Sequence, residues 1–253
     1  MIGGFPPQDL DCPDPAGCTV AVAQLEKLAR SGQLPEVSFP AHRHWFRVYD
    51  ARDDYSDPNP GFGDTRFAPF DAVATGARVP TLYLAETLVA ALLESSLHDA
   101  HEQEPRVVSE MSLLGKLHAR VIPPSALRLT DLRDPQLDAL GLARENLASS
   151  PSEHYPCTRR VARAIHASPP APAGIIWHSR QAELNASGAQ EVAVVFADRV
   201  SRARGAWRLG PCRDASGSLL EGAGRLLLDE LAESLNVTIS TSDELGSFLD
   251  TGP

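Results

Sequence analysis

The segment of residues 81–94 constrains the fold most. It predicts a short strand that carries Tyr83 and runs directly into a helix that carries Glu94. On a helical wheel the leucines gather on one side, whereas Glu94 shares the other side with Ala90 and Ala91. Small neighbours would let a ligand or another backbone approach this face closely, although a solvent-facing glutamate is the simpler interpretation.

Helices and strands alternate along the rest of the chain without the regular βαβ period of a doubly wound sheet, and we find no internal repeat or long linker. We therefore predict a single α+β domain in three parts: an N-terminal extension with one helix (1–43), a core (44–205) and a C-terminal helical extension packed on the core (206–253). The expected helices lie at 19–30, 85–97, 134–142, 157–167 and 219–235. The expected strands lie at 44–49, 81–83, 116–122, 127–132, 174–177, 192–196 and 237–239.

Charge and hydropathy limit the possible settings and partners. The net charge of −10 over 253 residues argues against direct nucleic-acid binding, which needs a basic face, but leaves room for a local basic pocket. The N-terminus lacks the basic and apolar regions of a secretory signal, and no window approaches about 18 uninterrupted apolar residues. We expect a cytoplasmic protein without a membrane segment.

The cysteines and histidines suggest no metal site from their spacing. Four cysteines are scattered along the chain without a CxxC pair, at Cys12, Cys18, Cys157 and Cys212. Unpaired thiols in a reducing compartment are the expected state, and Cys12 and Cys18 could bind a metal only with partners that the sequence does not reveal. The histidines show no HExxH-like spacing. No metal site is therefore predicted.

Two arginines are candidates for binding an anion. The chain has neither a GxGxxG nor a GxxxxGK[ST] loop, so phosphate recognition would fall to arginine side chains. Arg47 sits inside an apolar strand, where it either lies on a solvated face or turns into a pocket. Arg66 lies in a Gly/Asp-containing loop, where a lone arginine is usually a surface residue. Tyr83 would by default be a core or rim aromatic.

Ser179 follows an apolar strand and stands next to His178. This pair could suggest a serine nucleophile and its base. However, the GxSxG motif is missing, and adjacent side chains on a strand point to opposite faces. We therefore reject a serine hydrolase at this position.

Several segments, taken together and in this order, resemble the RES domain family, which is named for an arginine, a glutamate and a serine. The resemblance covers roughly residues 44–200. Its segments are Phe46-Arg47-Val-Tyr49, Arg66-Phe67-Ala-Pro69, Leu82-Tyr83-Leu-Ala with Ala91-Leu-Leu-Glu94, Leu129-Thr-Asp-Leu132 with Ala139-Leu-Gly-Leu142, and Gly174-Ile-Ile-Trp-His-Ser179-Arg180.

The resemblance implies a mixed β core like that of ADP-ribosyltransferase toxins, which clasps NAD in an extended cleft. It also implies an enzyme that breaks the nicotinamide–ribose bond of NAD, with inorganic phosphate or water as acceptor. NAD is then the substrate, and no cofactor is expected. Many RES proteins are toxins whose genes lie beside an Xre-like antitoxin that blocks the cleft, so such an antitoxin is the expected protein partner.

The family roles carry over to five positions of this chain. Arg47 and Arg66 would hold the NAD phosphates, and Tyr83 would pack against the nicotinamide or its ribose. Glu94 would hydrogen-bond the ribose hydroxyls and stabilise the oxocarbenium-like transition state. Ser179 would be a positioning hydroxyl in the pocket rather than a covalent nucleophile.

Two other functions remain open from the sequence. A mono-ADP-ribosyltransferase would use a protein side chain as the acceptor, and a silent RES scaffold would bind a partner or nucleotide without turnover. The terminal extensions could cover the cleft or form a homodimer.

Overall fold

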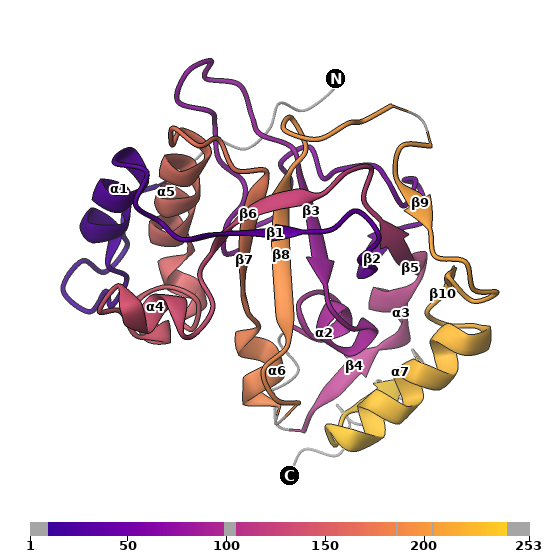
Figure 1. Ribbon diagram of the computed structural model, residues 1–253. Helices are drawn as coiled ribbons and strands as arrows, with labels where there is room; N and C mark the ends of the chain where they lie inside the picture. The colour runs from indigo at the N-terminus through magenta and orange to yellow at the C-terminus, as the bar shows by residue number, and fades with distance from the viewer. Residues whose placement is uncertain (1–9, 99–104, 186, 204, 242–253) are drawn as a thin grey trace, which may run out of the picture.

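The computed structural model describes residues 10–98, 105–185, 187–203 and 205–241. In these residues nine strands form one mixed sheet at the centre of the molecule (Figure 1). The strands of this sheet are β1 (Glu36–Phe39), β2 (Trp45–Asp50), β3 (Thr81–Ala85), β5 (Lys116–Ile122), β6 (Leu127–Asp131), β7 (Gly174–His178), β8 (Glu191–Phe196), β9 (Arg208–Leu209) and β10 (Ser216–Ser218). Their order is β1-β6-β7-β8-β3-β2-β5-β10, and β9 also pairs with β5. The β6–β7 pair is parallel and the other pairs of this sheet are antiparallel.

Helices lie around this sheet, together with a small parallel pair of strands, β4 (Val107–Ser109) and β11 (Thr238–Ser240). The α-helices are α1 (Val22–Arg30), α2 (Leu88–Leu93), α3 (Glu110–Leu113), α4 (Gln136–Ala139), α5 (Tyr155–His166), α6 (Arg180–Leu184) and α7 (Gly222–Ser234). Helices α1 and α5 pack together at one side, and α7 runs beside β10 at the other (Figure 1). The predicted α+β class is confirmed.

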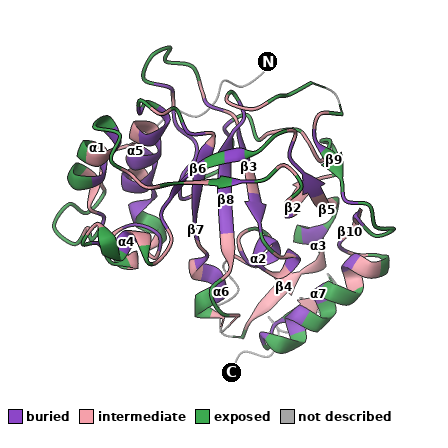
Figure 2. Ribbon diagram, in the orientation of Figure 1, coloured by how far each residue is buried: buried purple, intermediate pink, exposed green. Residues whose placement is uncertain are grey.

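The sheet separates two hydrophobic cores because alternate side chains of each strand point to opposite faces. Trp177 and Val194 belong to the larger core, on the side of α2 and α5, whereas Ile176 and Val195 belong to the smaller core on the other side. Strands β7 and β8 are buried over most of their length (Figure 2). The same alternation turns Tyr83 towards the larger core.

Helix α2 is shorter than the helix predicted over residues 85–97. Ala85 still pairs with Val192 in the sheet, and the helix begins only after Thr87, whose Oγ1 accepts a hydrogen bond from Ala90 N–H at 3.1 Å. The helix ends at Leu93, so Glu94 occupies its C-cap. The carboxylate therefore lies at the end of a helix rather than along its side.

The segments outside the expected core contribute to the same sheet. Strand β1 pairs with β6 at one edge, and β9 and β10 both pair with β5 near the other. These three short strands have little sequence signal, because β1 is half polar and β10 reads Ser-Gly-Ser. These segments form strands because they pair with the longer strands β5 and β6.

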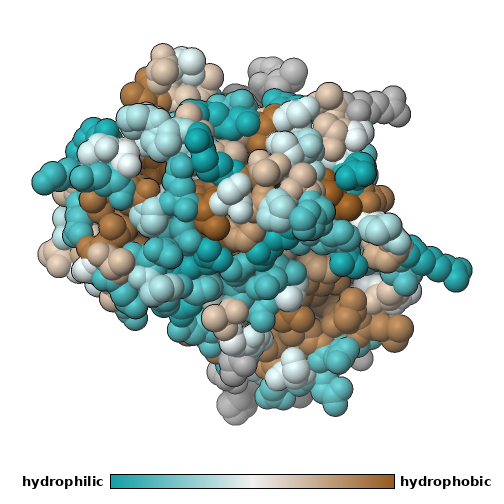
Figure 3. All heavy atoms as spheres, viewed as in Figure 1, coloured by the Kyte–Doolittle hydropathy of each residue, from teal (hydrophilic) through white to brown (hydrophobic). Residues whose placement is uncertain are grey.

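An ion pair between Glu110 of α3 and Arg225 of α7 brings these two helices together. Figure 3 shows a hydrophobic area over α7. Four large apolar side chains are exposed in this region: Met111, Leu114, Leu226 and Leu227. We call these four residues the α3–α7 apolar patch.

Within the described residues, none of the helices has the length and apolar character needed to cross a bilayer.

Candidate functional site

A cavity of about 630 Å³ opens on the α2 side of the sheet. Arg66, Tyr83 and Glu94 all line it, so three of the residues singled out in the sequence meet in one place. Its walls come from β2, β3, the loop of residues 63–66, the segment after α2 and the start of α5. His98 and Lys116 add an imidazole and an ammonium group to the wall. This volume falls within the range of about 300–1,000 Å³ that is typical of small-molecule sites.

A buried serine holds Glu94 from behind. The Ser179 hydroxyl donates a hydrogen bond of 2.5 Å to Glu94 Oε1. Its oxygen also accepts the backbone N–H of Ala182 at 3.0 Å and so caps α6. Ser179 is fully buried, whereas Glu94 is partly exposed and borders the cavity. The serine therefore fixes the orientation of the carboxylate and does not itself line the cavity.

This arrangement agrees with the rejection of a serine hydrolase. The hydroxyl proton of Ser179 is directed to Glu94. The neighbouring His178 has its Nδ1 atom 3.8 Å from Asp134 Oδ2 instead. No Ser–His pair forms at this position.

Tyr83 supports the loop that carries Arg66. Thr65 Oγ1 donates to the carbonyl of Ala68, so the Tyr83 hydroxyl, 2.7 Å away, donates to Thr65. The same hydroxyl accepts the backbone N–H of Phe67 at 3.1 Å. Burial raises the pKa of Tyr83, so the phenol stays protonated over the physiological range. Tyr83 therefore lines the cavity with its ring and anchors residues 65–67 with its hydroxyl.

Arg66 is a buried cation with one nitrogen committed to the protein. Its Nη1 atom donates to the carbonyl oxygens of Leu147 and Ser150, at 3.2 and 2.9 Å, and to Ser150 Oγ at 2.9 Å. Its guanidinium carbon lies 5.0 Å from the centroid of the Tyr155 ring. Burial lowers the pKa of Arg66, and the nearby Tyr155 and Glu94 oppose that shift. These hydrogen bonds to described residues all use Nη1, and Arg66 lines the cavity, so its other guanidinium nitrogens are the candidates for contact with a ligand.

Sequence reasoning missed His98, Lys116 and Tyr155. The His98 Nε2 atom lies 3.1 Å from both the Tyr155 hydroxyl and the Gln181 side-chain amide. Lys116 Nζ lies 3.8 Å from Asp50 Oδ2. These residues come from distant segments, and only the order of strands brings them to one cavity. A sequence feature that could have drawn attention to Tyr155 is the following Pro156, because proline is common in the first turn of a helix and α5 begins at Tyr155.

Arg47 lies on the other face of the sheet. The side chains of the neighbouring Val48 and of Tyr83 both pack against the larger core. The guanidinium of Arg47 instead donates to the carbonyl oxygens of Tyr55 and Asp57, at 2.7 and 3.0 Å. Burial lowers its pKa to about 10. A hollow of about 40 Å³ borders both Arg47 and Glu94, which is room for a water molecule rather than a ligand. The structure thus does not bring the Arg47 guanidinium into the main cavity, and its phosphate-binding role stays a prediction.

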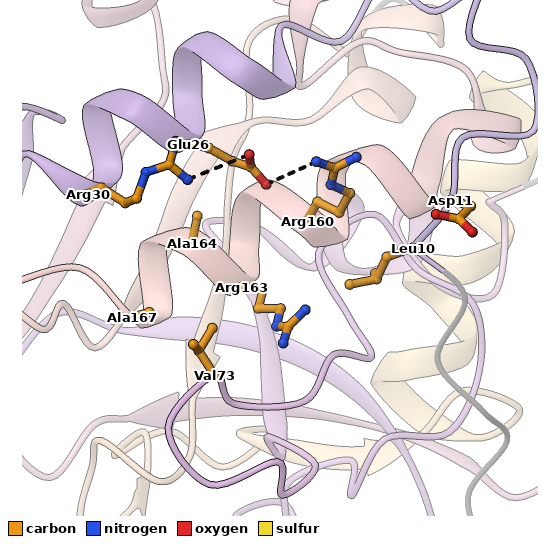
Figure 4. A pocket seen from close by; sticks show the side chains of 9 residues that line it. All are labelled: Leu10, Asp11, Glu26, Arg30, Val73, Arg160, Arg163, Ala164 and Ala167. Atoms are coloured by element: carbon orange, nitrogen blue, oxygen red, sulfur yellow. Dashed lines mark hydrogen bonds and ion pairs between the residues drawn. The ribbon is translucent and has the colours of Figure 1, made fainter.

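A second cavity, of about 520 Å³, lies between α1 and α5 (Figure 4). Glu26 of α1 forms ion pairs with Arg30 at 3.7 Å and with Arg160 at 3.4 Å, as the dashed lines show. This cavity contains none of the site residues predicted from the sequence. We therefore assign the candidate site to the cavity at Glu94.

The candidate site combines a fixed carboxylate with two cations. Arg66 and Lys116 can attract an anionic ligand, and Glu94 can accept hydrogen bonds from hydroxyl groups or stabilise a developing positive charge. Tyr83 and Tyr155 offer aromatic surface for a planar group. An anionic ligand with hydroxyls and an aromatic ring fits these wall groups.

The family of the chain follows from a direct comparison. The RES domain profile matches residues 16–210. The chain therefore belongs to the RES domain family, and the resemblance noted in the sequence is confirmed. No curated protein matches the sequence.

A solved structure shares the fold. A chain of the M. tuberculosis MbcT–MbcA toxin–antitoxin complex superposes with a TM-score of 0.50 at 18% identity. The match covers 84% of this chain and 96% of the other. At this identity the similarity concerns the fold, a mixed sheet with flanking helices in a single domain.

Proposed function

We propose that this protein is an NAD-degrading enzyme that breaks the nicotinamide–ribose bond and acts as the toxin of a toxin–antitoxin pair. The observation that carries the proposal is the position of Glu94, which borders the cavity while Ser179 holds its carboxylate from behind. Membership of the RES family and the fold shared with a toxin–antitoxin protein support the same function.

The chemistry requires stabilisation of positive charge. When the bond between ribose C1′ and the nicotinamide nitrogen breaks, its electron pair moves to the pyridinium nitrogen, and nicotinamide leaves as a neutral molecule. The ribose is left with an oxocarbenium-like charge, which a fixed carboxylate stabilises more than it stabilises the ground state. In this proposal Glu94 supplies that carboxylate. An oxygen of phosphate or water then bonds to C1′. A water oxygen releases one proton to the solvent as the bond forms, whereas a phosphate oxyanion bonds without losing a proton.

The remaining wall groups would hold the pyrophosphate and the nicotinamide end of NAD. Arg66 and Lys116 supply positive charge for the pyrophosphate, in a chain whose net charge is otherwise −10. Tyr83 supplies ring surface beside Glu94, where nicotinamide or its ribose would pack. We assign the main phosphate contact to Arg66, because the Arg47 guanidinium bonds to backbone carbonyls on the opposite face of the sheet.

The protein partner would be an antitoxin that covers the cavity. Ser112 and Lys116, at the cavity wall, flank Leu114 of the α3–α7 apolar patch. An antitoxin that packed on the patch would lie against the mouth of the cavity, and exposed apolar surface of this kind often marks a binding surface. We propose this patch as its docking area.

Expression in a bacterial host tests the toxin. Induction of the wild-type chain should deplete cellular NAD and stop growth, whereas Glu94→Ala expressed to the same level should do neither. Equal growth inhibition by both forms would exclude the proposed mechanism. Recovery of NAD-derived label on protein, when the purified enzyme is mixed with labelled NAD and host lysate, would favour a mono-ADP-ribosyltransferase instead.

A further inference from the structure

A cluster of cysteine and histidine side chains lies outside the candidate site. The sulfur atoms of Cys12, Cys18 and Cys157 and a ring nitrogen of His154 all lie within 4.8 Å of one another. Cys12 and Cys18 belong to the arm before α1, His154 ends a 3₁₀ turn, and Cys157 lies in the first turn of α5. The fold thus assembles a Cys3His set from residues up to 145 positions apart.

Two separations within the set are close to those of a tetrahedral metal site. Cys18 Sγ lies 3.6 Å from Cys157 Sγ, and Cys12 Sγ lies 3.9 Å from His154 Nδ1. A tetrahedral zinc site has Zn–S bonds of about 2.3 Å and Zn–N bonds of about 2.0–2.1 Å, which place neighbouring ligand atoms about 3.5–3.8 Å apart. Both of these separations lie close to the distance expected between neighbouring ligands of a tetrahedral zinc ion.

Other uses of these thiols account for the arrangement less well. A disulfide between Cys18 and Cys157 would need their sulfur atoms to close to about 2.05 Å, and it would leave Cys12 and His154 unexplained. A single reactive thiol would need only one of the three cysteines, and it would not explain why four ligand atoms lie within 4.8 Å of one another. Four convergent nitrogen and sulfur ligands are instead typical of a closed structural site.

We propose that Cys12, Cys18, His154 and Cys157 bind one structural Zn²⁺ ion. Three thiolates and one imidazole suit this borderline-soft cation better than Mg²⁺ or Ca²⁺, which prefer oxygen ligands. Four protein ligands leave no open coordination position, so the ion is structural rather than catalytic. The proposal does not depend on NAD turnover.

The ion would fasten the N-terminal arm to one wall of the candidate site. His154 precedes Tyr155, whose ring lies against the Arg66 guanidinium and whose hydroxyl contacts His98. The arm already docks nearby, because Thr19 Oγ1 donates to the carbonyl of Glu145 at 2.8 Å. Zinc would add a crosslink across this seam and hold the wall in place.

Metal analysis of the full-length chain, purified without a histidine tag, tests the proposal. We expect one Zn²⁺ per chain in the wild-type protein. Chain refolded with Co²⁺ should show the visible d–d bands of a tetrahedral site together with thiolate-to-metal charge transfer. The double variant C12S/C18S should lose both the bound zinc and the Co²⁺ spectrum. The matched control is Cys212→Ser, which removes the exposed cysteine outside the cluster and should keep both.

Stability provides a second readout that needs no enzyme assay. A strong chelator should lower the Tm of the wild-type chain and of Cys212→Ser by at least about 5 °C, and it should leave the Tm of C12S/C18S unchanged. If the double variant proves unstable, the Co²⁺ spectrum of the wild-type chain decides alone. Zinc-free protein with an octahedral Co²⁺ spectrum, or a Cys18–Cys157 disulfide in protein kept under reducing buffer, would overturn the proposal.

Discussion

At the scale of single residues, the candidate site depends on one hydrogen bond that the sequence could not show. Ser179 lies 85 positions from Glu94, and its hydroxyl donates to the carboxylate while capping α6. The sequence did predict that Glu94, Arg66 and Tyr83 bear on function, and the structure places all three around one cavity. Arg47 could be read either as a solvated residue or as a pocket residue; the structure buries its side chain against a loop.

Substitution of Ser179 tests its role as a positioning residue. Ser179→Ala removes the donor to Glu94 and the cap of α6, so we expect kcat for NAD to fall about tenfold or more with a smaller change in KM. The lost cap should lower stability by about 0.5–2 kcal/mol. Ser179→Thr keeps the hydroxyl and should restore much of kcat. A loss of kcat in Ser179→Thr as deep as in Ser179→Ala, with both chains folded, would argue against this role.

At the scale of helices and strands, the sequence was informative where a segment carries its own pattern. Strand β5 was predicted at its observed bounds from alternation, and β8 to within one residue from its apolar run. The helix over residues 85–97 was predicted too long, because Ala85 is recruited by pairing with β8. Strands β1, β9 and β10 carry too little pattern to be found without their partners. In each of these segments, pairing with a neighbouring strand determined the secondary structure more than the local sequence did.

A contact between the last residue of α5 and the turn after β8 gives a stability prediction that depends on pH. His166 Nε2 lies 2.9 Å from Asp198 Oδ2. Burial is the largest single influence and would raise the pKa of Asp198. The hydrogen bond and electrostatic attraction of His166, together with Arg199 and a backbone hydrogen bond, outweigh burial and hold the pKa below its ordinary value of 3.8. A carboxyl whose pKa is lower in the folded state stabilises the fold above its unfolded pKa and loses that contribution as the pH falls through the folded value.

We therefore expect Asp198→Asn to lower the Tm near neutral pH. The loss should correspond to about 0.2–1 kcal/mol, since the carboxylate is partly exposed. The difference from the wild-type chain should shrink as the pH falls below 3.8. Thermal melts of both proteins across that range are the measurement, and a difference that stays constant down to the lowest pH would contradict the assignment.

At the scale of the whole molecule, function depends on segments that are far apart in the chain and meet only in the fold. The cavity joins β2, β3, the ends of α2 and α5, and Lys116 of β5. Two cationic side chains line this cavity, although the net charge of the chain is −10. The amino-acid composition alone could not show where these cations come together. The cluster of Cys12, Cys18, His154 and Cys157 also forms only in the folded chain. Its members show no metal-binding spacing in the sequence, and the fold brings their ligand atoms within 4.8 Å of one another. Family resemblance suggested the proposed chemistry, and the fold shows which of the candidate residues lie together around one cavity.

The most direct test of the central claim is analysis of the products formed from NAD by the purified chain, with and without phosphate. We expect the wild-type protein to release nicotinamide together with either ADP-ribose phosphate, formed only when phosphate is present, or ADP-ribose in both buffers. Glu94→Gln should lower the rate by about 100-fold or more, because the stabilising charge is lost. Glu36→Gln, at an exposed glutamate of the edge strand β1, should not. Release of nicotinamide at the same rate by wild-type and Glu94→Gln protein, or no release by either in any buffer, would contradict the assignment.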